Sequence, residues 1–198
     1  MSVPALHATA VDADERWLWC LPPGLVPRAG ALERLVAAVA PDGEPPASIV
    51  AGLVLDDSGR PATDALPGFG PADVAEVLRL LAHEACPIRH AELAHCLVAR
   101  DALERHGLPD AAAYGRHAGR EWTARVLREE PGRFCATSVA VRATAPRPRR
   151  GAAALRDLGP TVRAARARTW NRGESLRAFA DLAREAGLRR PRRAGGPG

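Results

Sequence analysis

The stretch from Arg16 to Leu35, RWLWCLPPGLVPRAGALERL, contains the local pattern that decides the fold. It opens with Trp17 to Leu21, a run of bulky apolar side chains that is typical of a buried strand. Pro22 and Pro23 end that strand, because proline has no backbone N–H to donate and forces the preceding residue into an extended conformation. From Gly30 to Ala40 the apolar residues follow helical spacing. The stretch therefore predicts a strand, a rigid uncharged turn and a helix.

The rest of the chain alternates in the same way. Strands are predicted over 48–55, 92–99 and 133–143, and helices over 72–85, 100–107 and 119–130. This alternation predicts an α/β or α+β layered domain, and it leaves short antiparallel strands open. With 198 residues, 46% of them hydrophobic, the chain can bury one ordinary core. We expect a cytoplasmic protein, because the sequence shows neither a membrane-spanning apolar run nor a signal peptide.

Charge is divided unevenly along the chain. Residues 1–140 hold 13 arginines and 19 acidic residues, whereas residues 141–198 hold 15 arginines and four acidic residues. We therefore expect a folded domain over 1–145 and an Arg-rich tail over 146–198, with helices over 151–170 and 173–190 and a disordered end. The tail could dock on the domain, bind an anionic membrane surface or a partner protein, or simply be solvated. Nucleic acid is disfavoured as its partner, because charge is the only feature that favours it.

Cysteine and histidine usage does not predict a metal or disulfide site. Four cysteines are too few for a disulfide scaffold of this length, so we expect buried, reduced thiols. Five metal-ligand residue types cluster in the sequence, but their spacing matches no known zinc module: His83, Cys86, His90, His95 and Cys96. A phosphate-binding loop, a nucleophile elbow and an H-E-x-x-H motif are also missing from the sequence. We therefore predict no metal site and no cofactor.

Three phrases occur in a fixed order along the chain. They are WLWCLPPGLVPRAGALERL from Trp17, IVAGLVLDDSGRP from Ile49 and HCLVARDALERHGLPD from His95. In this order they resemble family-2 glycosyltransferases of the rhamnosyl and galactofuranosyl type, over residues 16–144. The resemblance implies an α/β, partial GT-A-like (nucleotide-diphospho-sugar transferase) layered domain. The family's opening nucleotide-binding strands are not represented, since only 16 residues precede Trp17.

The chain departs from the family where the family's chemistry lies. In the family, aspartates at the end of the first quoted strand hold a divalent cation that neutralises the diphosphate of the sugar donor. Pro22, Pro23 and Gly24 occupy those places here, and none has a side chain that can ligate a cation. A second acidic pair, which includes the general base, falls on Ala118 and Gly119. A histidine that often follows the family's last strand falls near Arg142.

Two interpretations follow from the resemblance. In the first, the domain is active, and arginines take the place of the metal beside the diphosphate; the candidates are Arg116, Arg120 and Arg142. The candidates for the general base are Glu121 and His117. The candidates for binding substrate are Trp122 and Asp110. In the second, the domain is degenerate and Glu121 and Trp122 are merely packed helix residues.

The combined losses favour the second interpretation. We therefore expect a glycosyltransferase-like protein that does not transfer sugar alone and that could work with a partner glycosyltransferase chain. The alternative is a non-catalytic interaction protein whose basic tail binds a partner protein or an anionic surface, in the cytoplasm or peripherally at the inner membrane face.

Overall fold

A mixed β-sheet forms the centre of the computed structural model, which describes residues 16–62, 64–68, 85–143, 156–166, 179–180 and 182–183. The strands are β1 (Trp17–Cys20), β2 (Leu25–Pro27), β3 (Ile49–Leu55), β4 (Cys86–Pro87), β5 (Cys96–Ala99) and β6 (Gly132–Arg142). Their order is β1-β5-β3-β6-β2, and β4 also pairs with β6. Strands β3 and β6 are parallel, whereas the other pairs are antiparallel. The sheet is therefore mixed, and the predicted α/β class is confirmed at that level.

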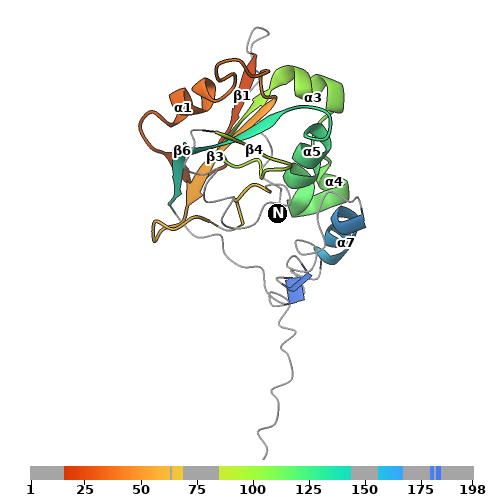
Figure 1. The fold of residues 1–198 in the computed structure, drawn as a ribbon. Helices are drawn as coiled ribbons and strands as arrows, with labels where there is room; N and C mark the ends of the chain where they lie inside the picture. Colours follow the sequence, from red (N-terminus) through yellow and green to blue (C-terminus); the bar gives the residue numbers. More distant parts are fainter. Residues whose placement is uncertain are drawn as a thin grey trace, which may run out of the picture.

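Helices cover both faces of this sheet (Figure 1). The helices of the described residues are α1 (Ala31–Ala37), α3 (Arg100–His106), α4 (Ala111–Tyr114), the 3₁₀ turn η1 (Gly115–His117), α5 (Ala118–Val126) and α7 (Leu158–Arg166). In β3, Ile49 packs into the same cluster as α3 and α5, whereas Val50 packs into the cluster that holds Leu35 of α1. Because successive strand residues point to opposite faces, this alternation shows helices on both sides of the sheet.

Strand β5 is shorter than the sequence predicts. The predicted strand covered 92–99, but the observed strand begins at Cys96. The residue before it, His95, has a φ of 54°, a left-handed conformation that a strand cannot contain. The helix predicted over Gly30 to Ala40 is also shorter and ends at Ala37. The helices α3 and α5 and the strands β3 and β6 lie within a few residues of their predicted ranges.

Part of the Arg-rich tail packs on the domain. Helix α7 lies within the helix predicted over 151–170, and it contacts α4 and η1. Two of its side chains, Thr161 and Ala164, are fully buried. Of the second predicted tail helix, only 179–180 and 182–183 are described, and Leu182 is buried there. The helix predicted over 72–85 falls almost wholly outside the described residues.

No helix in the described part of the chain combines the length and the apolar character that crossing a bilayer requires. The longest helices there, α5 and α7, each have nine residues.

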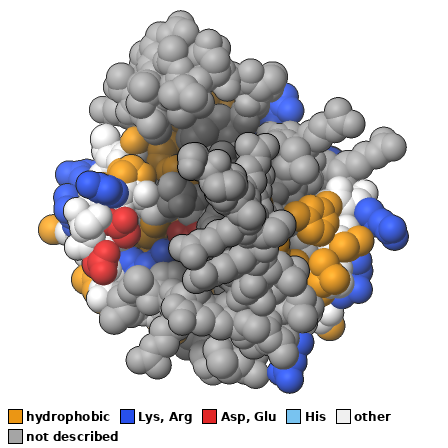
Figure 2. All heavy atoms as spheres, turned by 90° about the horizontal axis from the view of Figure 1, so that it is seen from below, with side chains coloured by type: hydrophobic (Ala, Val, Ile, Leu, Met, Phe, Trp, Pro, Cys, Tyr) orange, Lys and Arg blue, Asp and Glu red, His pale blue; other side chains and the backbone are white. Residues whose placement is uncertain are grey.

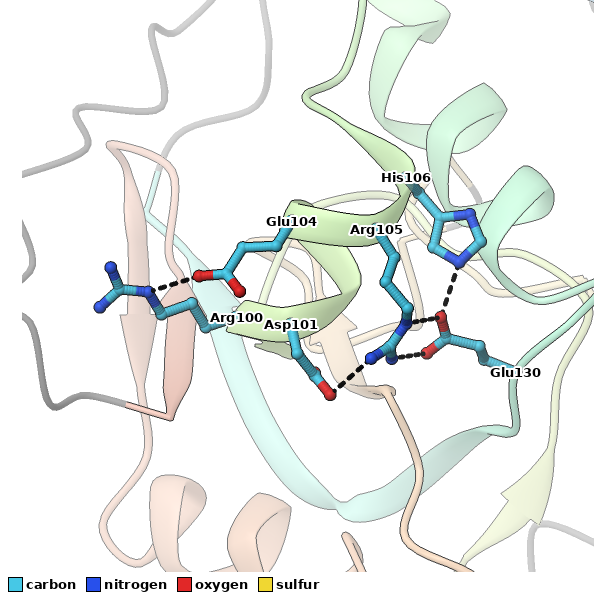
Figure 3. A network of polar contacts seen from close by, with 6 residues as sticks. All are labelled: Arg100, Asp101, Glu104, Arg105, His106 and Glu130. Carbon is cyan, nitrogen blue, oxygen red and sulfur yellow. Dashed lines mark hydrogen bonds and ion pairs between the residues drawn. The ribbon is translucent and has the colours of Figure 1, made fainter.

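A polar network ties the C-terminal end of α3 to the loop after α5 (Figure 3). Arg105 donates from Nε and Nη2 to the two carboxylate oxygens of Glu130, at 3.0 and 2.9 Å, and from Nη1 to Asp101 at 2.8 Å. His106 Nε2 lies 2.6 Å from Glu130 Oε1. Burial alone would raise the pKa of Glu130, but hydrogen bonds from Arg105, Ser48 and His106 outweigh it and hold that pKa at about 2.

The replacement Glu130→Gln is expected to lower the free energy of unfolding by about 2 kcal/mol at neutral pH. The carboxylate contributes its full stability above its usual pKa of 4.5, and this contribution is lost as the pH falls toward about 2. The difference in the free energy of unfolding between wild type and variant should therefore be smaller at about pH 3 than at neutral pH. Urea unfolding at both pH values measures it. The matched control is Glu104→Gln, which removes only an exposed ion pair with Arg100 and should cost less than about 1 kcal/mol. A difference that does not change with pH would contradict the assignment.

Candidate functional site

The Pro22-Pro23-Gly24 turn lies beside the end of β6. The turn is closed by a hydrogen bond from the Leu25 N–H to the Pro22 carbonyl at 3.2 Å, and Gly24 has a φ of 89°, which favours glycine. Leu25 is paired with Arg142, and the Ala143 N–H donates to the Gly24 carbonyl at 2.8 Å. Segments about 120 residues apart in the sequence therefore meet here.

Arg142 is paired within the chain. Its Nη1 lies 3.0 Å from Oδ1 of Asp64, on the loop after β3. The Arg142 side chain is 17% exposed, whereas that of Asp64 is 59% exposed, so water screens the pair only from one side. In the view from below, acidic side chains likewise lie beside arginines on part of the described surface (Figure 2). The guanidinium predicted to bind a diphosphate is thus already paired with a carboxylate of the same chain.

Glu92 connects this pair to α5, and sequence reasoning missed it. The carboxyl is partly buried, and burial raises its pKa to about 7. Arg120 and Arg116 oppose this rise, whereas the negative charge of Asp64 adds to it. The charges of Arg120, Arg116 and Asp64 thus act on Glu92, and Asp64 in turn pairs with Arg142. We call these five residues, three of them predicted site residues, the Glu92 cluster.

His90 borders the Glu92 cluster. Arg120 Nη2 lies 2.9 Å from Nε2 of the His90 ring. The Gly68 N–H lies 3.2 Å from the other ring nitrogen, Nδ1. The ring also lies directly over Gly68, where a Cβ atom would come within 1.9 Å of His90 Nε2. The imidazole is therefore packed in place between a backbone and an arginine.

His117 is covered by α7. Its Nε2 lies 3.1 Å from the Thr161 hydroxyl, which itself donates to the Asp157 carbonyl at 2.6 Å. The hydroxyl must therefore accept from His117, which places the ring proton on Nε2. Burial, then the charges of Arg116 and Arg120, lower the pKa of His117 to about 4, although Asp157 opposes them. His117 is neutral at physiological pH and is a weak base.

The other predicted site residues have structural partners. Glu121 is 5% exposed, and its Oε1 lies 3.5 Å from Nε of Arg125, one turn further along α5. Trp122 is fully buried, and its indole N–H donates to the Gly107 carbonyl. Asp110 caps α4, accepting from the Ala113 N–H at 2.8 Å. These contacts are those of packed and capping residues, and the functional roles assigned by resemblance stay predictions.

The residues at the turn do not fit a divalent cation. Hard cations bind oxygen ligands, and the side chains of Pro22, Pro23 and Gly24 have none. Across the residues that the structure describes, no group of three or more His, Cys, Asp or Glu side chains could hold a metal ion. The Glu92 cluster contributes two carboxylates, and arginines lie beside both.

A cavity of about 740 Å³ lies elsewhere, between α1, β4 and the start of β6. Its lining includes Arg34 and Arg133. Arg133 donates to Glu44 and to the carbonyls of Val39 and Pro45, at 2.6 to 3.1 Å. Most of its donors are therefore engaged in holding the loop after α1, so the residue has a structural role.

Comparison with known proteins adds no relative: the chain matches no family model, and no curated protein matches it.

Proposed function

We propose that the chain is a family-2 glycosyltransferase-like protein with a partial GT-A-like domain that does not transfer sugar on its own. The observation that carries this proposal is the contact between the Pro22-Pro23-Gly24 turn and the end of β6 at Arg142. The resemblance places the metal-binding aspartates on the first segment and a histidine on the second. Their proximity in space supports the view that both belong to one ancestral site.

The charges around this site also support a domain without transferase activity. In sugar transfer the diphosphate is the leaving group, and positive charge beside it must stabilise the negative charge that develops there in the transition state. Here Arg142 is paired with Asp64 at 3.0 Å, and Arg116 Nε lies 3.8 Å from Asp157 Oδ2. Any incoming diphosphate would have to compete with the chain's own carboxylates. The predicted bases are also poorly suited, since His117 has a pKa of about 4 and Glu121 is held by Arg125.

One observation favours the rival function, sugar transfer assisted by arginines. Glu92 has a pKa of about 7 and lies near Arg120 and Arg116. A general base works best with a pKa near the operating pH, and cations beside it could neutralise a diphosphate. In that case Glu92, rather than His117 or Glu121, would accept the proton of the acceptor hydroxyl.

Activity and ligand assays separate the two functions. We expect no release of nucleotide diphosphate from a panel of nucleotide sugars above a heat-denatured control. We also expect no saturable rise in melting temperature with manganese and a nucleotide diphosphate, where a site filled at about 100 times its dissociation constant would add about 2.7 kcal/mol. Release that is lost in Glu92→Gln and in Arg120→Ala, but kept in the control Arg100→Gln on α3, would establish arginine-assisted transfer instead.

A further inference from the structure

Two thiols face each other across the outer strand pair of the sheet. Cys20 is the last residue of β1, and its direct partner in the antiparallel ladder is Cys96, the first residue of β5. Directly opposed residues in such a ladder have Cα atoms about 4.5 to 5.5 Å apart. A disulfide spans Cα separations of about 4.4 to 6.8 Å. The backbone therefore already holds these two residues at a separation that a disulfide can bridge.

The two side chains also contact each other. A hydrogen bond between the thiols lowers the pKa of Cys20, against the opposing effect of burial, and raises the pKa of Cys96. The contact between the thiols thus favours the thiolate on Cys20 over that on Cys96. Cys20 is also the more accessible of the two, at 7% exposed against 0% for Cys96.

We propose that Cys20 and Cys96 form an oxidation site, at which hydrogen peroxide or another small hydroperoxide produces a reversible cross-strand disulfide. The Cys20 thiolate attacks one peroxide oxygen, the O–O bond breaks, and the departing hydroxide takes up a proton to give water. The resulting sulfenic acid on Cys20 is then attacked by the sulfur of Cys96. The S–O bond breaks, and its oxygen leaves as a second water with the Cys96 proton. Two thiols and one peroxide thus give one disulfide and two waters.

The other two cysteines provide an internal comparison. All four cysteines are free and buried, so burial alone does not distinguish the pairs. Cys86 is opposite Phe134 rather than opposite Cys135, and burial raises its pKa to about 11. The Cys135 thiol lies 3.6 Å from the Arg34 carbonyl and 3.3 Å from the Thr137 hydroxyl. Neither thiol has the other as its ladder partner, so we assign the oxidation site to Cys20 and Cys96 alone.

The position of the disulfide gives it a structural consequence. β1 is the last strand in the sheet order, and β5 is its neighbour there. A bond from Cys20 to Cys96 would fasten the end of this strand directly before Leu21 and the Pro22-Pro23-Gly24 turn. Oxidation should therefore slow the opening of β1, whatever the function of the Glu92 cluster. This inference does not rest on the proposed function.

The test treats the full-length folded protein with hydrogen peroxide, blocks the remaining thiols under denaturing conditions and maps the peptides without reduction. We expect one linked pair, Cys20 with Cys96, with the mass loss of two hydrogens and with reversal by dithiothreitol. Slower amide hydrogen exchange in β1 should accompany it. The control variants Cys86→Ser and Cys135→Ser should still form the link.

Cys96→Ser should abolish the link and leave Cys20 as a sulfenic acid that dimedone labels. If that variant fails to fold, the map of the wild-type protein decides by itself. Absence of the link after peroxide treatment, or links involving Cys86 or Cys135 in similar yield, would overturn the proposal.

Discussion

Replacement of Trp122 by alanine is expected to lower the free energy of unfolding by about 4 kcal/mol. The indole is fully buried among side chains that include Phe134 and Val126, and its N–H donates to the Gly107 carbonyl. The substitution removes that packing, opens a cavity and leaves the carbonyl without its donor. Urea unfolding measures the loss as a lower midpoint.

The matched control is Trp122→Phe, which keeps an aromatic ring in the core and loses the hydrogen bond and part of the volume. It should cost about 1 to 2 kcal/mol. The comparison also tests the role that resemblance assigns to Trp122. Unchanged stability in Trp122→Ala, together with lost binding of a nucleotide sugar, would contradict the core role and favour substrate binding.

The strands and helices could be predicted because their signals are local. Proline at 22 and 23 ends β1, whose last residue, Cys20, lies one residue before the end of the apolar run at Leu21. The mostly apolar run over 48–55 predicts a strand, and β3 lies there at Ile49–Leu55 with residues 49–52 buried. Strand pairing is not local, so the sequence did not show that β5 lies antiparallel between β1 and β3.

The candidate site could be predicted only in part. Arg116, Arg120 and Arg142 are candidates from the sequence, and the structure brings their charges near Glu92 or its neighbour Asp64. Glu92 itself has no local signal, because its raised pKa depends on burial and on charges contributed by distant segments. Within one sequence it is one more acidic residue ahead of an apolar strand.

Helical geometry explains why neighbouring candidates have different surroundings. Each residue of an α-helix turns by about 100°, so Arg120 and Trp122 point in directions about 200° apart. Arg120 accordingly contacts His90, whereas Trp122 lies in the core. The resemblance assigns Arg120 and Trp122 to one site, but residues two apart on a helix do not share a face.

The buried side chain of His95 packs against Gly52 of β3, and no sequence pattern predicts this close approach. His95 is fully buried with a φ of 54°, and its Nε2 lies 2.9 Å from the Ser138 hydroxyl. Ser138 donates in turn to the Ala31 carbonyl at 2.7 Å, at the start of α1. The imidazole thus links β5, β6 and α1 across a strand position that has no side chain.

The replacement Gly52→Ala is therefore expected to lower the free energy of unfolding by about 3 kcal/mol. Its Cβ would lie 2.3 Å from Cδ2 and 2.5 Å from Nε2 of His95, and 2.8 Å from the Ser138 carbonyl oxygen. The backbone oxygen cannot move without shifting β6, and moving the ring breaks the bond to Ser138. Urea unfolding compares this variant with the wild-type protein and with the double variant Gly52→Ala/His95→Ala. Unchanged stability of Gly52→Ala would show that His95 does not occupy this position, whereas partial rescue of Gly52→Ala by His95→Ala would identify the imidazole as the obstacle.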